Sequence, residues 1–289
     1  RVEQLAQEAV THVASLGAGG AVVDLVPEFS FRFPIAVIGD LLGIPPADQP
    51  GMRATIGHVT TALDPIGDLG QLIPGDAGMS QLAEYFYELV ARHRARPEAN
   101  LTSDWVAARD AGNDITEDEL VGNLMLLLVA ATEAAQDLYS NMVRLALEHP
   151  GHGATFRDDP AAGPGFVDET LRFDPAVQAL NRVAARDLDY FGVRIPAGMP
   201  LTLLIAAANR DPARFDDPAV FNPARTDNQQ LTMSAGAHFC LGAALARMSA
   251  QIAVPLMLRR LPALALAGQP TFRDQIVQRG HDYLPVTTE

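Results

Sequence analysis

The chain has 289 residues, 48% of them hydrophobic, which is enough for a substantial buried core in one large or two small domains. A formal net charge of −14 argues against nucleic-acid binding, because that function needs a basic surface. The single cysteine excludes an intrachain disulfide framework. No apolar run approaches the length of a membrane span and no signal peptide opens the chain, so we expect a cytoplasmic protein without a membrane partner.

Helical patterns dominate the first half of the chain. Apolar residues recur at helical spacing over residues 1–16, and the glycine-rich stretch 17–20 predicts the end of that helix. We expect a short apolar helix over 34–42, a loop rich in glycine and proline over 64–78, and a longer amphipathic helix over 79–96. The chain opens in mid-helix without an initiator methionine, which suggests that it begins inside a longer protein.

The most informative helix is predicted from Thr116 to about Glu148. Thr116 and Glu119 have the spacing of a capping box, which marks a helix start. The helix is apolar on nearly all faces, so we expect it to cross the protein interior. Glu133 interrupts the apolar run, and a buried carboxylate is unfavourable unless it is paired or hydrated. Glu133 is therefore either a functional acid or a carboxylate bonded to the local backbone.

The second half of the chain mixes short helices with strands. A helix is predicted from Pro164 to Phe173, followed by strands and a hairpin over 177–204 and a meander rich in proline and aspartate over 209–225. A last helix, which Pro255 interrupts, leads to a β-rich tail. The resulting fold class is mainly α with minor β.

Cys240 lies in a short segment that combines a thiol with a glycine-rich turn. Gly236 allows a tight bend before the cysteine, Gly242 removes a side chain just after it, and residues 241–247 are expected to begin a helix. A helix N-terminus favours a thiolate, which is one form of axial ligand to haem iron. A lone cysteine taken by itself is more often a small buried hydrophobe, and the surrounding residues decide between the two interpretations.

The stretch Gly-Ala-His-Phe-Cys-Leu-Gly over 236–242, followed by Leu-Ala-Arg, closely resembles the haem-ligand loop of the cytochrome P450 superfamily. The usual bacterial form begins Phe-Gly, where this chain has Met233 and Ser234, a change that bears on sulfur hydrogen bonding and redox potential. The resemblance covers essentially the whole chain and implies a cytochrome P450 fold that lacks roughly the N-terminal quarter. Residues 1–289 are accordingly expected to form a single haem-thiolate oxygenase domain, N-terminally incomplete.

The resemblance implies a cofactor and the residues that hold it. The cofactor is haem b (iron protoporphyrin IX), with Cys240 as the iron ligand. His238 and Arg182 match positions that contact the haem propionates, for which the planar fork of arginine is suited. Phe239 and Gly242 flank the ligand and are expected to lie against the cofactor.

A second implied group is structural. Glu169 and Arg172 match a Glu-x-x-Arg helix, and Arg225 ends a matching Phe-x-Pro-x-Arg segment. In the family these three side chains form a buried ion cluster behind the haem-ligand loop, where the role of such a cluster is positional more than stabilising. Without the resemblance, Glu169 and Arg172 would be an ordinary surface pair.

The segment 130–134 matches the family's oxygen-activation motif with one important difference. Glu133 matches the acid, but Ala134 stands where the family has a threonine that holds a water and relays protons. Thr132 is a poor substitute, because it points to another face of the helix. The distal pocket is expected to be lined by three neighbouring residues, Leu127, Val129 and Ala130.

By resemblance, the protein is a monooxygenase that acts on paired donors and incorporates molecular oxygen into a small, largely apolar organic molecule, such as an intermediate of secondary metabolism. Electrons would come from a ferredoxin and a ferredoxin reductase, and Arg247, Arg259 and Arg260 are either a docking patch for an acidic ferredoxin or cations favoured at a helix C-terminus. Two alternatives stay open: a peroxide-using or non-hydroxylating haem-thiolate enzyme, and a truncated non-catalytic paralogue.

Overall fold

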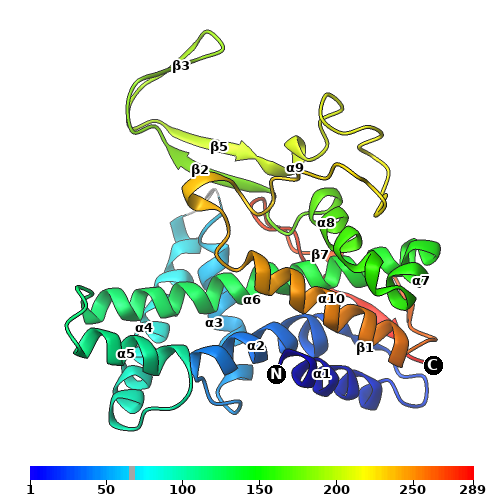
Figure 1. Ribbon diagram of the computed structural model, residues 1–289, viewed down its shortest axis with the longest axis horizontal. Helices are drawn as coiled ribbons and strands as arrows, with labels where there is room; N and C mark the ends of the chain where they lie inside the picture. Colours follow the sequence, from blue (N-terminus) through cyan, green and yellow to red (C-terminus); the bar gives the residue numbers. More distant parts are fainter. Residues whose placement is uncertain (65–68) are drawn as a thin grey trace.

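The structure, a computed structural model, describes residues 1–64 and 69–289. Helices form the body of the molecule, and the small β elements lie along its upper side and its C-terminal end (Figure 1). The helices are α1 (Val2–Leu16), α2 (Arg32–Leu42), α3 (Met52–Thr61), α4 (Leu72–Ala95), α5 (Leu101–Asp110), α6 (Glu117–Glu148), α7 (Pro150–Asp158), α8 (Gly163–Phe173), α9 (Ile205–Ala208) and α10 (Ala243–Arg260), with a one-turn π-helix at Val26–Phe31. None of them combines the length and the apolar character that crossing a bilayer requires.

The strands are short and form small antiparallel sheets. One sheet joins β1 (Val23–Asp24), β9 (Pro285–Thr287) and β6 (Ala265–Leu266) in that order. A second pairs β2 (Ala179–Val183) with β5 (Pro200–Leu204), and the hairpin β3 (Leu188–Tyr190) and β4 (Val193–Ile195) projects beyond it. The last pairs β7 (Thr271–Phe272) with β8 (His281–Tyr283). The mainly α class with minor β is therefore confirmed.

Helix α6 runs through the middle of the molecule, as its apolar sequence predicts. It begins at the N-cap Thr116, whose side chain accepts a hydrogen bond from the Glu119 backbone while the Glu119 side chain accepts one from the Thr116 backbone. The N-terminal half of α6 packs in one hydrophobic cluster with α2, α3 and α4, and its C-terminal half packs in another with α1, α8 and α10. Each half of α6 is therefore fixed by its own hydrophobic cluster.

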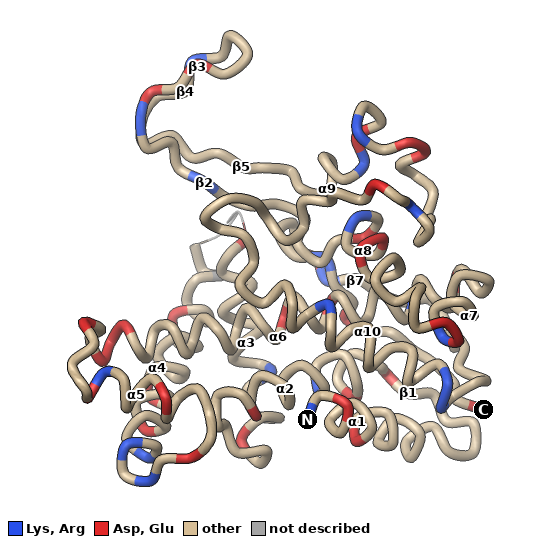
Figure 2. Tube along the Cα trace, in the orientation of Figure 1, with Lys and Arg blue, Asp and Glu red and all other residues tan. Residues whose placement is uncertain are grey.

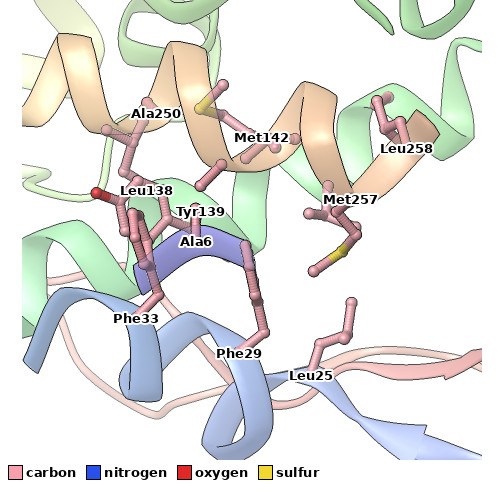
Figure 3. Close-up of a cluster of buried hydrophobic side chains, with 14 of the residues drawn as sticks. Ala6, Leu25, Phe29, Phe33, Leu138, Tyr139, Met142, Ala250, Met257 and Leu258 are labelled. Carbon is pink, nitrogen blue, oxygen red and sulfur yellow. The ribbon is translucent and has the colours of Figure 1, made fainter. Parts of the chain in front are cut away.

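The cluster around the C-terminal half of α6 is built on aromatic and sulfur-containing side chains (Figure 3). Phe29 and Phe33 stack with ring centroids 6.0 Å apart, and the ring of Tyr139 from α6 lies 5.3 Å from Phe33. Met142 from α6 and Met257 from α10 fill the space above them. This packing fixes the separation between α6 and α10, the two helices that carry the residues of interest.

One predicted element is wrong in part. The loop expected over 64–78 is helical from Leu72 onward, where α4 begins, and residues 65–68 of that loop lie outside the described residues. Gly75 and Gly78 are not turn residues: both are buried against α3, and a side chain at Gly75 would overlap Ala62. These glycines allow two helices to approach closely, a use that composition alone does not distinguish from a loop.

The β2–β5 sheet and its hairpin carry apolar side chains that are largely exposed to solvent. Val183 and Leu204, at opposite ends of the paired strands, are about two thirds exposed, and Phe191 in the hairpin turn is 90% exposed. In the described part of the chain neither β2 nor β5 pairs along its second edge. The sheet therefore presents both apolar side chains and free backbone hydrogen-bonding groups.

Candidate active site

The segment that carries Cys240 folds as a tight turn leading into α10. Ser234 adopts φ 62° and Gly236 φ +66°, both in the left-handed region, and the chain then makes a single 3-10 turn. The Cys240 N–H donates a hydrogen bond to the Met233 carbonyl at 2.9 Å, which closes the turn. Ser234 thus shows why glycine is usual at its position, since a serine there is backbone-strained.

The thiol is presented at the start of a long helix. Cys240 lies two residues before Gly242, which is the N-cap of α10. The Cys240 carbonyl accepts a hydrogen bond from the Ala243 N–H at 3.2 Å. A Cβ atom added to Gly242 would lie 3.9 Å from Sγ, so the missing side chain leaves space beside the sulfur.

The surface around the thiol is apolar and uncharged. Phe239 and Leu241 flank it and are 55% and 89% exposed. No Asp, Glu, Lys or Arg occurs from residue 228 to residue 246, and Figure 2 shows the tube without charge colours as it approaches α10. Exposed apolar side chains around a half-buried thiol suit contact with a flat, largely apolar group.

The middle of α6 borders the same core cluster as the cysteine, because Ala135 and Cys240 both pack against it. Ala130 is exposed on α6 and Ala134, one turn later, is partly exposed. Of the residues expected to line a pocket, Leu127 is partly exposed, but Val129 is buried in the core cluster with α2 and α4. Val129 is therefore a core residue and the expectation for it is wrong, because its position in the helical repeat turns it inward.

Glu133 is buried and paired, as a carboxylate in an apolar helix must be. Its side chain is 3% exposed and its Oε2 accepts from Arg273 Nη1 at 2.7 Å. It therefore does not bond to the local backbone. Thr132 donates to the Leu128 carbonyl at 2.7 Å, so its hydroxyl is used within the helix and does not replace the one missing at Ala134.

The ion cluster expected at Glu169 is present. The Arg172 guanidinium, fully buried, donates to both Glu169 carboxylate oxygens at 2.8 Å, and Arg225 donates to the same carboxylate at 3.1 Å. Arg172 also donates to the carbonyls of Asn209, Pro218 and Val220. The cluster therefore ties α8 to the meander that precedes the cysteine segment.

Two further cationic candidates lie near the turn. Arg182 on β2 directs Nη2 to the Ser234 hydroxyl at 3.5 Å, and no carboxylate within the described ranges pairs with it. His238 is exposed in the turn itself. Arg182 also donates to the Asn181 carbonyl, and a guanidinium that forms no ion pair among the described residues is suited to an anionic group such as a haem carboxylate.

The three arginines of the last helix do not form one patch. Arg247 is paired with Asp168 at 2.9 Å, and Arg259 donates to the Arg157 carbonyl. Arg247 and Arg259 are twelve positions apart, which corresponds to about 18 Å along a helix. Only Arg247 is therefore close to the cysteine, and Arg259 and Arg260 occupy the helix C-terminus, where its dipole favours cations.

Sequence reasoning missed two members of the charged network behind Glu133. Asp137, one turn further along α6, also pairs with Arg273, and Arg273 itself follows β7 near the C-terminus. The i, i+4 spacing of Glu133 and Asp137 indicates that the two carboxylates lie on the same face of the helix. Arg273 is 140 residues away from Glu133 in sequence, so no local pattern indicates that it is their partner.

The residues present fit haem. A thiol at a helix start, apolar flanking side chains, glycines that leave space and a guanidinium outside any ion pair of the described residues suit a flat, anionic, metal-bearing group. Within residues 1–64 and 69–289, no group of three or more His, Cys, Asp and Glu side chains is placed to hold a bare metal ion.

Comparison with known proteins agrees with this class. The family model for cytochrome P450 matches residues 164–272. Cytochrome P450 107B1 of Saccharopolyspora erythraea is 34% identical over 290 residues, covering 99% of this chain and 69% of the relative. Cytochrome P450 123 of Mycobacterium tuberculosis is 36% identical over 268 residues, which are 92% of this chain and 66% of the relative.

Solved structures extend the match to the fold. P450BioI in complex with an acyl carrier protein ligated to hexadec-9Z-enoic acid superposes with a TM-score of 0.89 at 32% identity, covering all of this chain and 75% of that one. The myxobacterial cytochrome P450 CYP267B1 in complex with myristic acid gives 0.91 at 31% identity, covering 100% and 71%. The chain belongs to the cytochrome P450 family, and it spans about two thirds of the length of its curated relatives.

Proposed function

We propose that the whole protein is a haem-dependent monooxygenase that oxidises a small, largely apolar organic molecule, with haem b held at Cys240. The observation that carries the proposal is the half-buried thiol at the start of α10, beside the space left by Gly242. A thiolate-bound haem, when present, supplies oxygen activation: O2, an electron pair and a pair of protons put one oxygen atom into the substrate and release the other as water.

Each residue of the cysteine turn has a role in this proposal. Cys240 ligates the iron, His238 and Arg182 bind the haem carboxylates, and Phe239 and the backbone at Gly242 lie against the ring. The exposed positions of His238 and Phe239 support these roles, since side chains already packed or paired would be unable to bind a further group. The proximity of Arg182 to Ser234 supports its assignment to the same site.

The ion cluster of Glu169, Arg172 and Arg225 acts at a distance from the cofactor in this proposal. Its hydrogen bonds among the described residues go to the carbonyls of the meander and not to the cysteine turn. Asn209 continues the connection, accepting from the Leu231 N–H just before the turn. The cluster therefore positions the turn and is not catalytic.

Proton supply is assigned to Glu133. It is the carboxylate of α6 next to Ala134, where no hydroxyl exists to relay a proton. Its Oε2 accepts a hydrogen bond from Arg273, which holds the side chain in place. Ordered water or a substrate hydroxyl then has to complete the path from Glu133.

An apolar substrate is supported by the relatives. P450BioI and CYP267B1 were both solved with aliphatic acyl chains, and the exposed alanine face of α6 offers no charged group to a ligand. A ferredoxin, reduced by a ferredoxin reductase, is the proposed electron donor. It would dock near the start of α10, where Arg247 would exchange its pairing with Asp168 for a contact with the acidic partner.

The test is the carbon-monoxide difference spectrum of the reduced, haem-reconstituted protein. We expect the red-shifted Soret band of thiolate ligation, its loss in Cys240→Ser, and its retention in Ala237→Ser, a matched change at an exposed position of the same turn. A histidine-type band in the native protein, or an unchanged band in Cys240→Ser, would overturn the assignment.

A second candidate is a peroxide-using haem-thiolate enzyme, favoured by Ala134 and by the engagement of Thr132 with the Leu128 carbonyl. The variant Ala134→Thr separates the two candidates. If water or substrate already compensates in a monooxygenase, restoring the hydroxyl leaves the coupling of electron use to product unchanged. If the native protein turns over with peroxide alone and the variant gains coupled use of O2, the second candidate is correct.

A further inference from the structure

A polar crevice of about 400 Å³ opens behind Glu133. Its walls come from the start of α3, from α6 and from the C-terminal strands, and Glu133, Gln136, Arg273 and His281 line it. Both ring nitrogens of His281, Oε1 of Gln136 and Nε of Arg273 are buried without a hydrogen-bond partner among the described residues. Polar groups buried without a partner are unfavourable, so we expect water from the crevice to reach them.

Two carboxylates share one cation: Glu133, which lines the crevice, and Asp137, which lies behind the lining and accepts a hydrogen bond from Gln136. Arg273 donates to Glu133 at 2.7 Å and also to Asp137, whose side chain is completely buried. A side chain at Gly280 would overlap Asp137 Oδ1, so this glycine makes room for the contact. One guanidinium does not neutralise two buried carboxylates, and the less hydrated of them is the one that retains a proton.

The proton is held by Asp137. Burial raises the pKa of Asp137 to about 7, with a further increase from the charge of Glu133, although the charge and hydrogen bond of Arg273 act in the opposite direction. The group is therefore part protonated near neutral pH, where a proton can be both given and recovered.

Several ionisable groups surround Asp137, and His281 is one of them. Burial, together with nearby guanidinium groups, lowers the pKa of His281 to about 3, so its ring stays neutral. The charged and titratable groups around Asp137 and Arg273 come from three parts of the chain and from Asp174, which pairs with Arg144 and Arg279. They are Glu133 and Arg144 on α6, Arg53 on α3, and Arg273, Arg279, His281 and Asp282 in the C-terminal segments.

We propose that Asp137, Arg273 and the water of this crevice form a proton-holding site that supplies Glu133. In one cycle the O–H bond of Asp137 breaks and its proton passes to crevice water. Water gives a proton to the Glu133 carboxylate, and Glu133 releases it to an acceptor on the Ala134 side of α6 and becomes a carboxylate again. Solvent entering the crevice reprotonates Asp137. Protons balance and no oxidant is needed. Asp137 and Arg273 act through Glu133 and are positioning residues.

The use of this site in catalysis rests on the proposed function, whereas its existence does not. The site would compensate for the hydroxyl missing at Ala134 by placing a proton source on the crevice side of α6, one turn from Glu133. Its protonation can therefore be measured on the protein with or without haem.

The first test is infrared difference spectroscopy between pH values below and above about 7. We expect the carbonyl band of a protonated carboxylic acid to disappear with a midpoint near 7, to be absent in Asp137→Asn, and to persist in the control Asp227→Asn. Asp227 is exposed, and its hydrogen bond from Arg214 lowers its pKa. A native protein without the band, or a band that survives in Asp137→Asn, overturns the proposal.

A second variant keeps the test valid if Asp137→Asn folds poorly. Glu133→Gln removes the neighbouring negative charge, so the midpoint of the Asp137 band should move to lower pH. An unmoved midpoint would show that the two carboxyls are not coupled.

With haem bound, the pH profile of turnover tests the supply role. The native profile should break near pH 7 and Asp137→Asn should remove that break, and an identical profile would exclude the role. If the band is present but the protein holds no thiolate-bound haem, the proposed function fails alone.

Discussion

Replacing Arg172 with methionine tests how strongly the meander before the cysteine turn is held. The change removes a fully buried guanidinium that makes five hydrogen bonds: two to Glu169 and one each to the carbonyls of Asn209, Pro218 and Val220. Breaking a buried ion pair from one side costs about 3–5 kcal/mol, because the remaining charge stays buried.

The carbonyls add to this loss. Val220 keeps a donor from Arg225, but the described residues offer no second donor to the carbonyls of Asn209 and Pro218. Each buried acceptor left unpaired costs about 1–3 kcal/mol. The expected total is at least about 5 kcal/mol, similar to the whole stability of many domains.

The assay is urea unfolding followed by circular dichroism, with Arg214→Met as the matched control. Arg214 pairs with Asp227 at 2.8 Å on the surface, so its loss should change stability by no more than about 1 kcal/mol. If Arg172→Met lowers the unfolding midpoint no further than Arg214→Met does, the ion cluster does not hold the meander and the positional argument fails.

Three smaller predictions follow from other contacts. Thr116→Ala removes the α6 cap and should cost about 1 kcal/mol in thermal unfolding, and no change would mean that the capping box is not formed in solution. Gly280→Ala should lower the free energy of unfolding by about 1–3 kcal/mol, because the added methyl group overlaps Asp137. The control Gly122→Ala, on an open face of α6, should be neutral or stabilising. Equal effects of the two changes would refute the overlap. His281→Phe should make the protein more resistant to acid unfolding, because native His281 stays neutral down to about pH 3 whereas the unfolded chain binds the proton near pH 6.5. As pH falls between these values, the free energy of unfolding of the native protein should decrease by about 1.4 kcal/mol per pH unit relative to the variant. Parallel curves of stability against pH would contradict this.

Local sequence signals predicted the elements whose causes are local. The start of α6 follows from a capping box four residues long, and the cysteine turn follows from Gly236, Cys240 and Gly242 within seven residues. The Glu169 and Arg172 contact is likewise one helical turn. Such features are readable because the partners are neighbours in the chain.

Features that depend on distant partners were not readable. Glu133 could be recognised as needing a partner, but its partner Arg273 comes from the far end of the chain. Gly75 looked like a loop residue because its role, close packing against α3, exists only in the folded molecule. Val129 and Ala130 are adjacent apolar residues, and only the position of the neighbouring helices decides that one is buried and the other exposed.

The exposed β2–β5 sheet has a consequence for handling the protein. The free N–H and C=O groups along the edge of this sheet can form hydrogen bonds with a strand of another molecule. Exposed apolar side chains near that edge favour the contact, namely those of Val183, Leu203 and Leu204. This chain should therefore self-associate edge to edge as its concentration rises, giving a sedimentation coefficient that increases with loading. A lysine at Val183, which faces outward on β2, is the change that would keep the molecules apart.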